Sequence, residues 1–221
     1  EDWKSKSYMG SIFMGDFDVS MAYPFPFQKP DDKAIGDEIC AKIDAWCSEN
    51  IDGEEIDRSE CIPAHVWKGL ADMGLFGIKI PKKYGGLGLS QTNYMRILST
   101  VAMHCGSTTA TLSAHQSIGV PQPLKLVGTE EQKQKYLPKL ITGEHIGALA
   151  MSEPGAGSDA VSMRLRADKK GDRYVLNGNK MWITNGPDAH TYVIYAKTDP
   201  DAGPRGITAF LVERDFPGFS R

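Results

Sequence analysis

The chain has 221 residues, 41% of them hydrophobic, so it can form one large domain or two small ones around a substantial core. Its formal net charge of −3 and its lack of a Lys/Arg cluster interleaved with aromatic residues argue against a nucleic-acid partner. No stretch approaches the ~18 apolar residues that a membrane-spanning helix needs. We therefore expect a globular protein without a transmembrane segment.

The first 30 residues are rich in aromatic side chains and end in the run Tyr23-Pro24-Phe25-Pro26-Phe27. Each X-Pro step favours extended backbone, while the aromatic side chains need burial. We therefore predict that residues 1–30 form an arm packed across the surface of a domain. The chain begins at Glu1 without a signal-like segment, so we expect either that a targeting piece has been removed or that the chain belongs to a longer protein.

From Asp31 onward, apolar residues recur at three- and four-residue steps and predict a helical domain over residues 31–145. A helix of small and hydroxylated side chains at 106–116 either packs tightly on a neighbouring helix or lets a ligand chain approach. We interpret His115 in this helix as a partner in a polar network rather than as a catalyst. A capping box at Thr129 begins the last helix. The predicted helices span residues 31–50, 63–73, 90–101, 106–116 and 129–140.

A glycine-rich loop follows a short extended piece within residues 78–88. It lacks the Lys-Ser/Thr pair of a phosphate-binding P-loop and does not follow a long apolar strand. We therefore predict a structural connector rather than a phosphate cradle.

The four cysteines form no C-x-x-C pair and have no metal-like spacing to the five histidines. We expect reduced, buried cysteines and no metal site. Cys40 and Cys47 are seven residues apart, which places them on one helix face and favours core packing over a disulfide. The other two are Cys61 and Cys105.

After Glu144 the period of the sequence changes to two, which predicts an antiparallel β domain over residues 146–221. Alternation on both sides of Gly171 predicts a hairpin, and Asn177-Gly178 predicts a second turn. Helices followed by strands give an α+β fold of two units. An unclosed sheet would leave exposed edges, so we expect the natural chain to continue past Arg221. The further strands are predicted at 181–184, 191–196 and 207–212.

Two loops of the β domain carry the residues that best fit a ligand. The first, MSEPGAGSD at 151–159, is rich in glycine and contains Ser152; the second, GNKMWITNG at 178–186, contains Trp182 and Thr184. Together they could clamp a flat, polar-edged heterocycle. This arrangement suits an isoalloxazine ring, because such a ring needs an apolar wall on one face and hydrogen-bond donors along its edge. Taken alone, Trp182 would be a core residue more often than a cofactor wall.

These two runs resemble the flavin-domain signatures of the acyl-CoA dehydrogenase family, in the same order and at the same separation. The resemblance covers nearly the whole chain and implies the family's helical N-terminal and middle β domains, with its C-terminal helical domain absent from this chain. Residues 6–34 and 114–119 resemble the very-long-chain branch, whereas 148–171, 177–189 and 205–213 resemble the isovaleryl branch. Acyl length and branching therefore stay open.

The resemblance also implies roles for individual residues. Leu149, Met151 and Ser152 would line the pyrimidine side of FAD, with Gly157 and Ser158 in the same loop. Trp182, Ile183 and Thr184 would cover another part of the ring, with Thr184 near the nitrogen that receives hydride. Ser158 would also contact the thioester substrate. Arg205 would contact the CoA portion, although a solvated turn residue is an equal alternative.

The reaction implied is α,β-dehydrogenation of an acyl-CoA, with electrons passing to an electron-transfer flavoprotein. In the family the catalytic Glu lies in the C-terminal helical domain, so we expect no catalytic residue in this chain, and we expect Glu153 to shape its loop instead. A homodimer or homotetramer is implied, in the mitochondrial matrix of a eukaryote or the cytoplasm of a bacterium. The alternative is a non-catalytic scaffold or assembly factor that has kept the fold.

Overall fold

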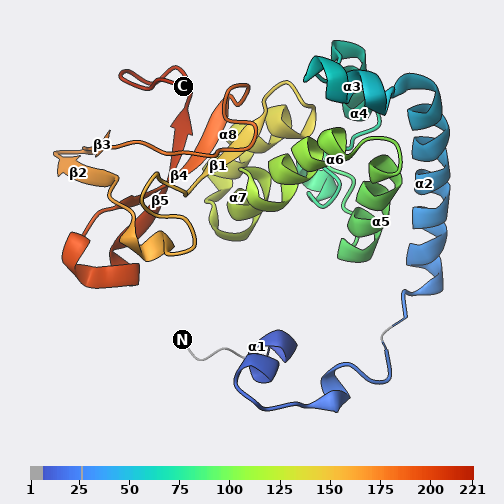
Figure 1. Ribbon diagram of the computed structural model, residues 1–221, viewed down its shortest axis with the longest axis horizontal. Helices are drawn as coiled ribbons and strands as arrows, with labels where there is room; N and C mark the ends of the chain where they lie inside the picture. The colour runs from blue at the N-terminus through green and yellow to red at the C-terminus, as the bar shows by residue number, and fades with distance from the viewer. Residues whose placement is uncertain (1–6, 26) are drawn as a thin grey trace.

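A computed structural model of the chain describes residues 7–25 and 27–221. A helical region comes first along the chain and a five-stranded mixed sheet follows (Figure 1). The helices are α1 (Tyr8–Phe13), α2 (Pro30–Asn50), α3 (Gly53–Ser59), α4 (Ala64–Asp72), α5 (Gln91–Ala102), α6 (Gly106–Ser113), α7 (Pro121–Val127) and α8 (Glu130–Ile141). The strands are β1 (Gly147–Ala150), β2 (Arg166–Lys170), β3 (Arg173–Asn177), β4 (Thr191–Lys197) and β5 (Ile207–Glu213).

Local sequence signals begin and end the helices as predicted. The Ser90 side chain accepts a hydrogen bond from the Asn93 amide and caps α5, and Thr129 and Gln132 form the capping box of α8. Gly74 follows α4 with a φ of +75°, which stops the helix because that conformation suits glycine. All five predicted helices are confirmed, while the short α1, α3 and α7 were not predicted.

The connector at residues 78–88 packs against its own start. The amide of Gly88 donates to Ile80 O at 2.9 Å, and the amide of Leu89 donates to Ile78 O at 2.9 Å. At Gly86 a Cβ atom would lie 2.1 Å from Ile80 O, so only glycine fits this close approach. The prediction of a structural connector is confirmed.

The sheet is mixed rather than antiparallel, which corrects the prediction made from strand alternation. The hairpin of β2 and β3 around Gly171 and the pairing of β4 with β5 are antiparallel, as expected. However, β4 pairs in parallel with β1, with Gly147 opposite Thr191, and again with β2 at Lys197. Alternation shows which side chains share a face of a strand, but it does not show in which direction the neighbouring strand runs.

The expected strand at 181–184 is also wrong, because these residues lie in a loop before β4.

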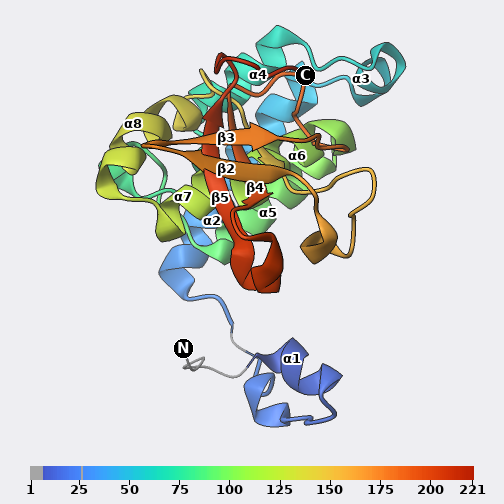
Figure 2. The same ribbon diagram turned by 90° about the vertical axis from the view of Figure 1, so that its left-hand side faces the viewer.

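Figure 2 shows the strands in front of the helices. Successive side chains along the strands enter two different cores. Leu149 and Val193 pack against α7 and α8, whereas Ala148 and Ile194 pack on the opposite face.

His115 joins the helical region to the sheet. It follows α6 in a π-helical turn, and its ring is completely buried. Nε2 lies 3.0 Å from Leu140 O and donates to it, while Nδ1 accepts from the amide of Gly147 at 3.0 Å. Burial lowers the pKa of His115 to about 4, so the ring is neutral at pH 7. The prediction of a polar-network role is confirmed.

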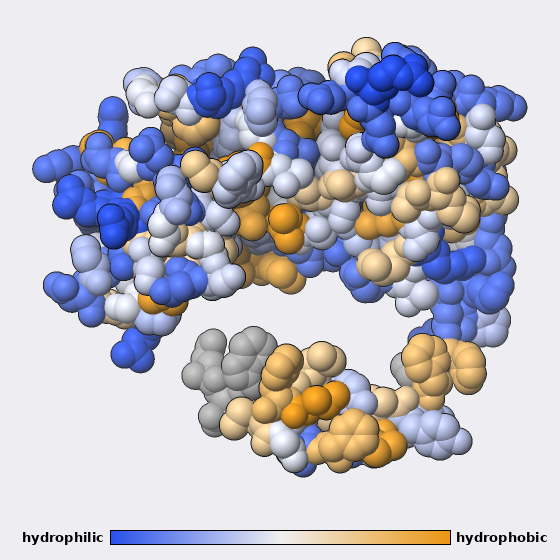
Figure 3. Space-filling view, viewed as in Figure 1, coloured by the Kyte–Doolittle hydropathy of each residue, from blue (hydrophilic) through white to orange (hydrophobic). Residues whose placement is uncertain are grey.

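The N-terminal arm lies apart from the rest of the molecule and exposes its apolar side chains (Figure 3). Phe13 is 85% exposed and Phe27 is 87% exposed, so the expectation of an arm packed across a domain surface is wrong for the described part of it. Residues 1–6 and Pro26 of the predicted arm lie outside the described residues. Gln28 contacts the helical region, because its side chain donates to Asn93 Oδ1 at 2.8 Å. The arm's aromatic rings instead contact each other; the ring centroids of Phe25 and Phe27, for example, are 5.9 Å apart.

Candidate functional site

The loops 151–159 and 178–186 lie side by side. The first follows β1, the second follows β3, and the amide of Met181 donates to Ser152 O at 2.9 Å. Trp182 has a φ of +59°, an uncommon conformation for a side chain of this size. Asn185 fastens the second loop to α6, because its side-chain amide donates to Thr111 O at 3.1 Å.

A buried ion pair also ties the two loops together. Lys180 Nζ lies 2.9 Å from Glu153 Oε1, and the side chains are 7% and 6% exposed. Glu153 accepts the amides of Arg164 at 2.6 Å and Leu165 at 3.0 Å, and Lys180 also donates to Met151 O at 2.9 Å. A buried pair with its remaining hydrogen bonds satisfied avoids the penalty of a lone buried charge.

These contacts decide the charge of Glu153. Burial acts to raise its pKa, but the amides of Arg164 and Leu165 and the ammonium of Lys180 outweigh burial, so the pKa lies below its ordinary value. The carboxylate is ionised and fully engaged inside its turn. The expectation that Glu153 shapes the loop is confirmed, whereas its partner Lys180 was not singled out from the sequence.

The predicted ligand-binding residues occupy several environments. Met151 and Ser152 are half-buried and contact 180–181 directly. Trp182 is 86% exposed. The remaining predicted residues of the two loops and of β1 divide by burial: Leu149 and Ile183 are half-buried in the two cores of the sheet, and Gly157, Ser158 and Thr184 are exposed.

Arg205 is not brought to the loops. It is exposed in the segment Pro200–Gly206, which follows the end of β4 at Lys197, whereas the loop 178–186 leads to the start of β4 at Thr191. No hydrogen bond or ion pair joins Arg205 to either loop within the described residues.

The loops leave polar groups and space available for a ligand. In the part of the chain that the structure describes, the hydroxyls of Ser152, Ser158 and Thr184 have no hydrogen-bond partner. A Cβ added at Gly155 or Gly157 would meet nothing within 4 Å. An exposed indole beside free donors and open space fits a flat cofactor with a polar edge, so the site is compatible with FAD.

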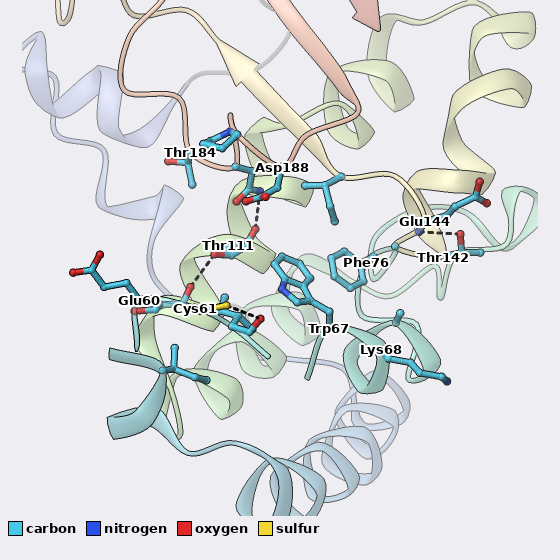
Figure 4. Close-up of a pocket in the computed structure, with 18 of the residues that line it drawn as sticks. Glu60, Cys61, Trp67, Lys68, Phe76, Thr111, Thr142, Glu144, Thr184 and Asp188 are labelled. Atoms are coloured by element: carbon cyan, nitrogen blue, oxygen red, sulfur yellow. Dashed lines mark hydrogen bonds between the residues drawn. The ribbon is translucent and has the colours of Figure 1, made fainter. Parts of the chain in front are cut away.

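A cleft of about 1280 Å³ borders the second loop at Thr184 (Figure 4). Its opposite wall comes from the helical region, where Trp67 and Phe76 stack with ring centroids 5.5 Å apart. Cys61 also lines the cleft and is exposed, which corrects the expectation that every cysteine is buried. Trp67 lies in α4, whereas Cys61 and Phe76 lie in the segments before and after this helix, so no local motif in the sequence joins them. The cleft offers stacked aromatic surface beside hydroxyl and carboxylate groups.

The described residues contain neither a metal-binding cluster nor a membrane-spanning helix. No group of three or more His, Cys, Asp or Glu side chains is arranged to hold a metal ion. None of the helices in that part of the chain has the length and apolar character needed to cross a membrane.

Comparison with known proteins identifies both regions. Residues 36–144 match the model for the N-terminal domain of acyl-CoA dehydrogenases, and residues 148–221 match the model for the middle domain. Mitochondrial isovaleryl-CoA dehydrogenase from Solanum tuberosum is 51% identical over 179 residues, covering 79% of this chain and 43% of the relative. The probable acyl-CoA dehydrogenase FadE10 of Mycobacterium bovis is 42% identical over 221 residues, covering 99% of this chain and 34% of the relative.

One solved structure with the same fold is a complex with FAD. The acyl-CoA dehydrogenase from Bacillus anthracis, in complex with FAD, superposes with a TM-score of 0.75 at 35% identity and covers 87% of this chain and 33% of that chain. This chain therefore spans less than half the length of each of these relatives.

Proposed function

Since the chain belongs to the acyl-CoA dehydrogenase family, we propose that it supplies the FAD-binding surface of an enzyme that dehydrogenates acyl-CoA thioesters. The observation that carries this proposal is the tied pair of loops 151–159 and 178–186. Their backbones are hydrogen-bonded, their buried charges neutralise each other, and their outer groups are free to bind a ligand.

When bound, FAD would accept the hydride that leaves the β-carbon of the substrate. Ser152 and Met151 would hold the pyrimidine edge of the ring, and Trp182 would cover part of it. The Thr184 hydroxyl would serve as a hydrogen-bond donor near the centre that receives hydride. Ser158 would contact the thioester, and Arg205 would attract the phosphates of CoA.

The reaction also needs a base that removes the proton from the α-carbon. Glu153 is unsuited to this task because two amides and Lys180 already occupy its carboxylate, which is buried and has a lowered pKa. We therefore do not assign the base to Glu153, and we propose no other described residue for this role.

We propose a short branched acyl-CoA as the substrate, because the potato relative that shares 51% of its aligned residues is named for isovaleryl-CoA. A long-chain thioester is the alternative. Electrons would pass to an electron-transfer flavoprotein, and the protein would act as a homodimer or homotetramer. The compartment would be the mitochondrial matrix in a eukaryote or the cytoplasm in a bacterium.

The visible spectrum of the purified full protein tests the proposal. It is recorded anaerobically before and after addition of isovaleryl-CoA, and separately of palmitoyl-CoA. A flavin band that isovaleryl-CoA bleaches faster supports the proposed enzyme and substrate class, and faster bleaching by palmitoyl-CoA would replace only the substrate class. A flavin band that neither thioester bleaches would leave a binding protein, and a protein that binds no flavin would favour the non-catalytic scaffold.

A further inference from the structure

The Met151–Ser152 peptide has a fixed orientation. Lys180 Nζ donates to Met151 O at 2.9 Å. A trans peptide is planar, so its carbonyl and its amide hydrogen point in opposite directions, and the Ser152 N–H points away from Lys180. The next carbonyl, Ser152 O, is held by the amide of Met181. Within the described residues, neither the backbone amide nor the hydroxyl of Ser152 has a hydrogen-bond partner.

Lys180 can hold this carbonyl only while its own charge is balanced. Its side chain is 7% exposed, and a buried ammonium without a counter-ion is strongly disfavoured. Glu153 supplies the counter-ion at 2.9 Å, and the amides of Arg164 and Leu165 fix that carboxylate in place. The chain of contacts therefore runs from the two residues before β2, through Glu153 and Lys180, to the Met151 carbonyl.

We propose that Lys180, with Glu153 as its buried counter-ion, is a positioning residue that orients the Ser152 amide, beside the free Ser152 hydroxyl, to bind the flavin. This inference rests on the proposed function, because it assigns these donors to FAD. Flavin binding would then depend on more than the exposed residues, because a buried ion pair beneath the binding surface orients the Ser152 peptide.

The alternative is a purely structural role, in which this pair stabilises the fold without affecting the flavin. Glu153→Gln/Lys180→Met separates the two roles because it removes both charges together and leaves no unpaired buried ion. Glu153→Gln alone keeps the volume and one acceptor oxygen, so one of the two amides keeps its partner. Lys135→Met is the matched control, because Lys135 pairs with Glu213 at 2.6 Å but is 62% exposed on α8.

The experiment uses the full protein and its FAD-free form. The dissociation constant is measured from the quenching of FAD fluorescence, the flavin environment from visible circular dichroism, and stability from thermal unfolding without FAD. We expect the double variant to bind FAD at least about tenfold more weakly, which is about 1.4 kcal/mol, with a changed flavin dichroism. We expect Glu153→Gln to weaken binding severalfold and the Lys135→Met control to match the unsubstituted protein.

The outcomes are distinct. Weaker FAD binding and altered dichroism in a variant whose FAD-free form unfolds near the normal temperature support the positioning role. If either folded variant binds FAD with the affinity and dichroism of the unsubstituted protein, the positioning role is overturned. The pair would then have a purely structural role, even if the unfolding temperature falls. If the unsubstituted protein itself bound no FAD, both this inference and the proposed function would fail.

Discussion

Lowering the pH should destabilise the protein through His115. The ring is buried and neutral, and it bridges the Leu140 carbonyl and the Gly147 amide between α8 and β1. Burial lowers its pKa from 6.5 to about 4, and this difference corresponds to about 3 kcal/mol. Because the unfolded chain binds a proton at higher pH than the folded chain, this contribution is complete above pH 6.5 and is lost as the pH falls toward 4.

Chemical denaturation at a series of pH values measures this contribution. The comparison is between the unsubstituted protein and His115→Gln, since glutamine has a donor and an acceptor but does not titrate. Contributions from groups that the substitution leaves unchanged cancel in the difference. We expect the advantage of the unsubstituted protein in free energy of unfolding to shrink by about 2.5 kcal/mol between pH 7.5 and 4.5. A difference that stays constant over this range would refute the argument that a neutral buried ring joins the two regions.

Three other substitutions test separate parts of the structure. Trp182→Ala should change the free energy of unfolding by less than about 0.5 kcal/mol, because the indole is 86% exposed. The same change should weaken FAD binding measured by fluorescence, and unchanged binding would remove Trp182 from the site. Gly86→Ala should lower the midpoint of thermal unfolding by several degrees, because a Cβ would lie 2.1 Å from Ile80 O, whereas Gly106→Ala meets nothing within 4 Å and serves as its control. Arg205→Gln should raise KM for an acyl-CoA but not for the matching pantetheine thioester, and an equal rise for both would contradict a contact with the CoA phosphates.

Signals that act over a few residues were readable from the sequence. The capping box at Thr129 and the turn at Gly171 depend on neighbours within four positions, and both occur where predicted. The parallel pairing of β1 with β4 depends on segments 44 residues apart, as the register of Gly147 with Thr191 shows, and nothing local specifies it. The prediction that the N-terminal arm packs across a domain was wrong for a related reason. Its aromatic side chains show a need for burial, but they do not identify the surface that would bury them.

The candidate site shows the same division. Its two loops stand out in the sequence through their glycine content and the residue types they combine, and the structure places them side by side. Lys180 could not be recognised, because most lysines are exposed and only the fold brings this one within 2.9 Å of Glu153. Met181 and Ile183 alternate with polar residues as in a strand, which explains the wrong strand prediction. The Met181 amide instead donates to Ser152 O in the neighbouring loop.

The parallel ladder of β1 and β4 has a consequence for the way the site assembles and opens. Both loops belong to the segment 151–190, whose two ends are joined by this ladder. Pairing of such distant strands must wait for closure of the long intervening loop, so we expect the site to form late in folding, after the helices with local contacts. Transient opening of the ladder would release both loops at once. The hydrogen exchange rates of the β4 amides should therefore report on the integrity of the site from a strand that binds no ligand.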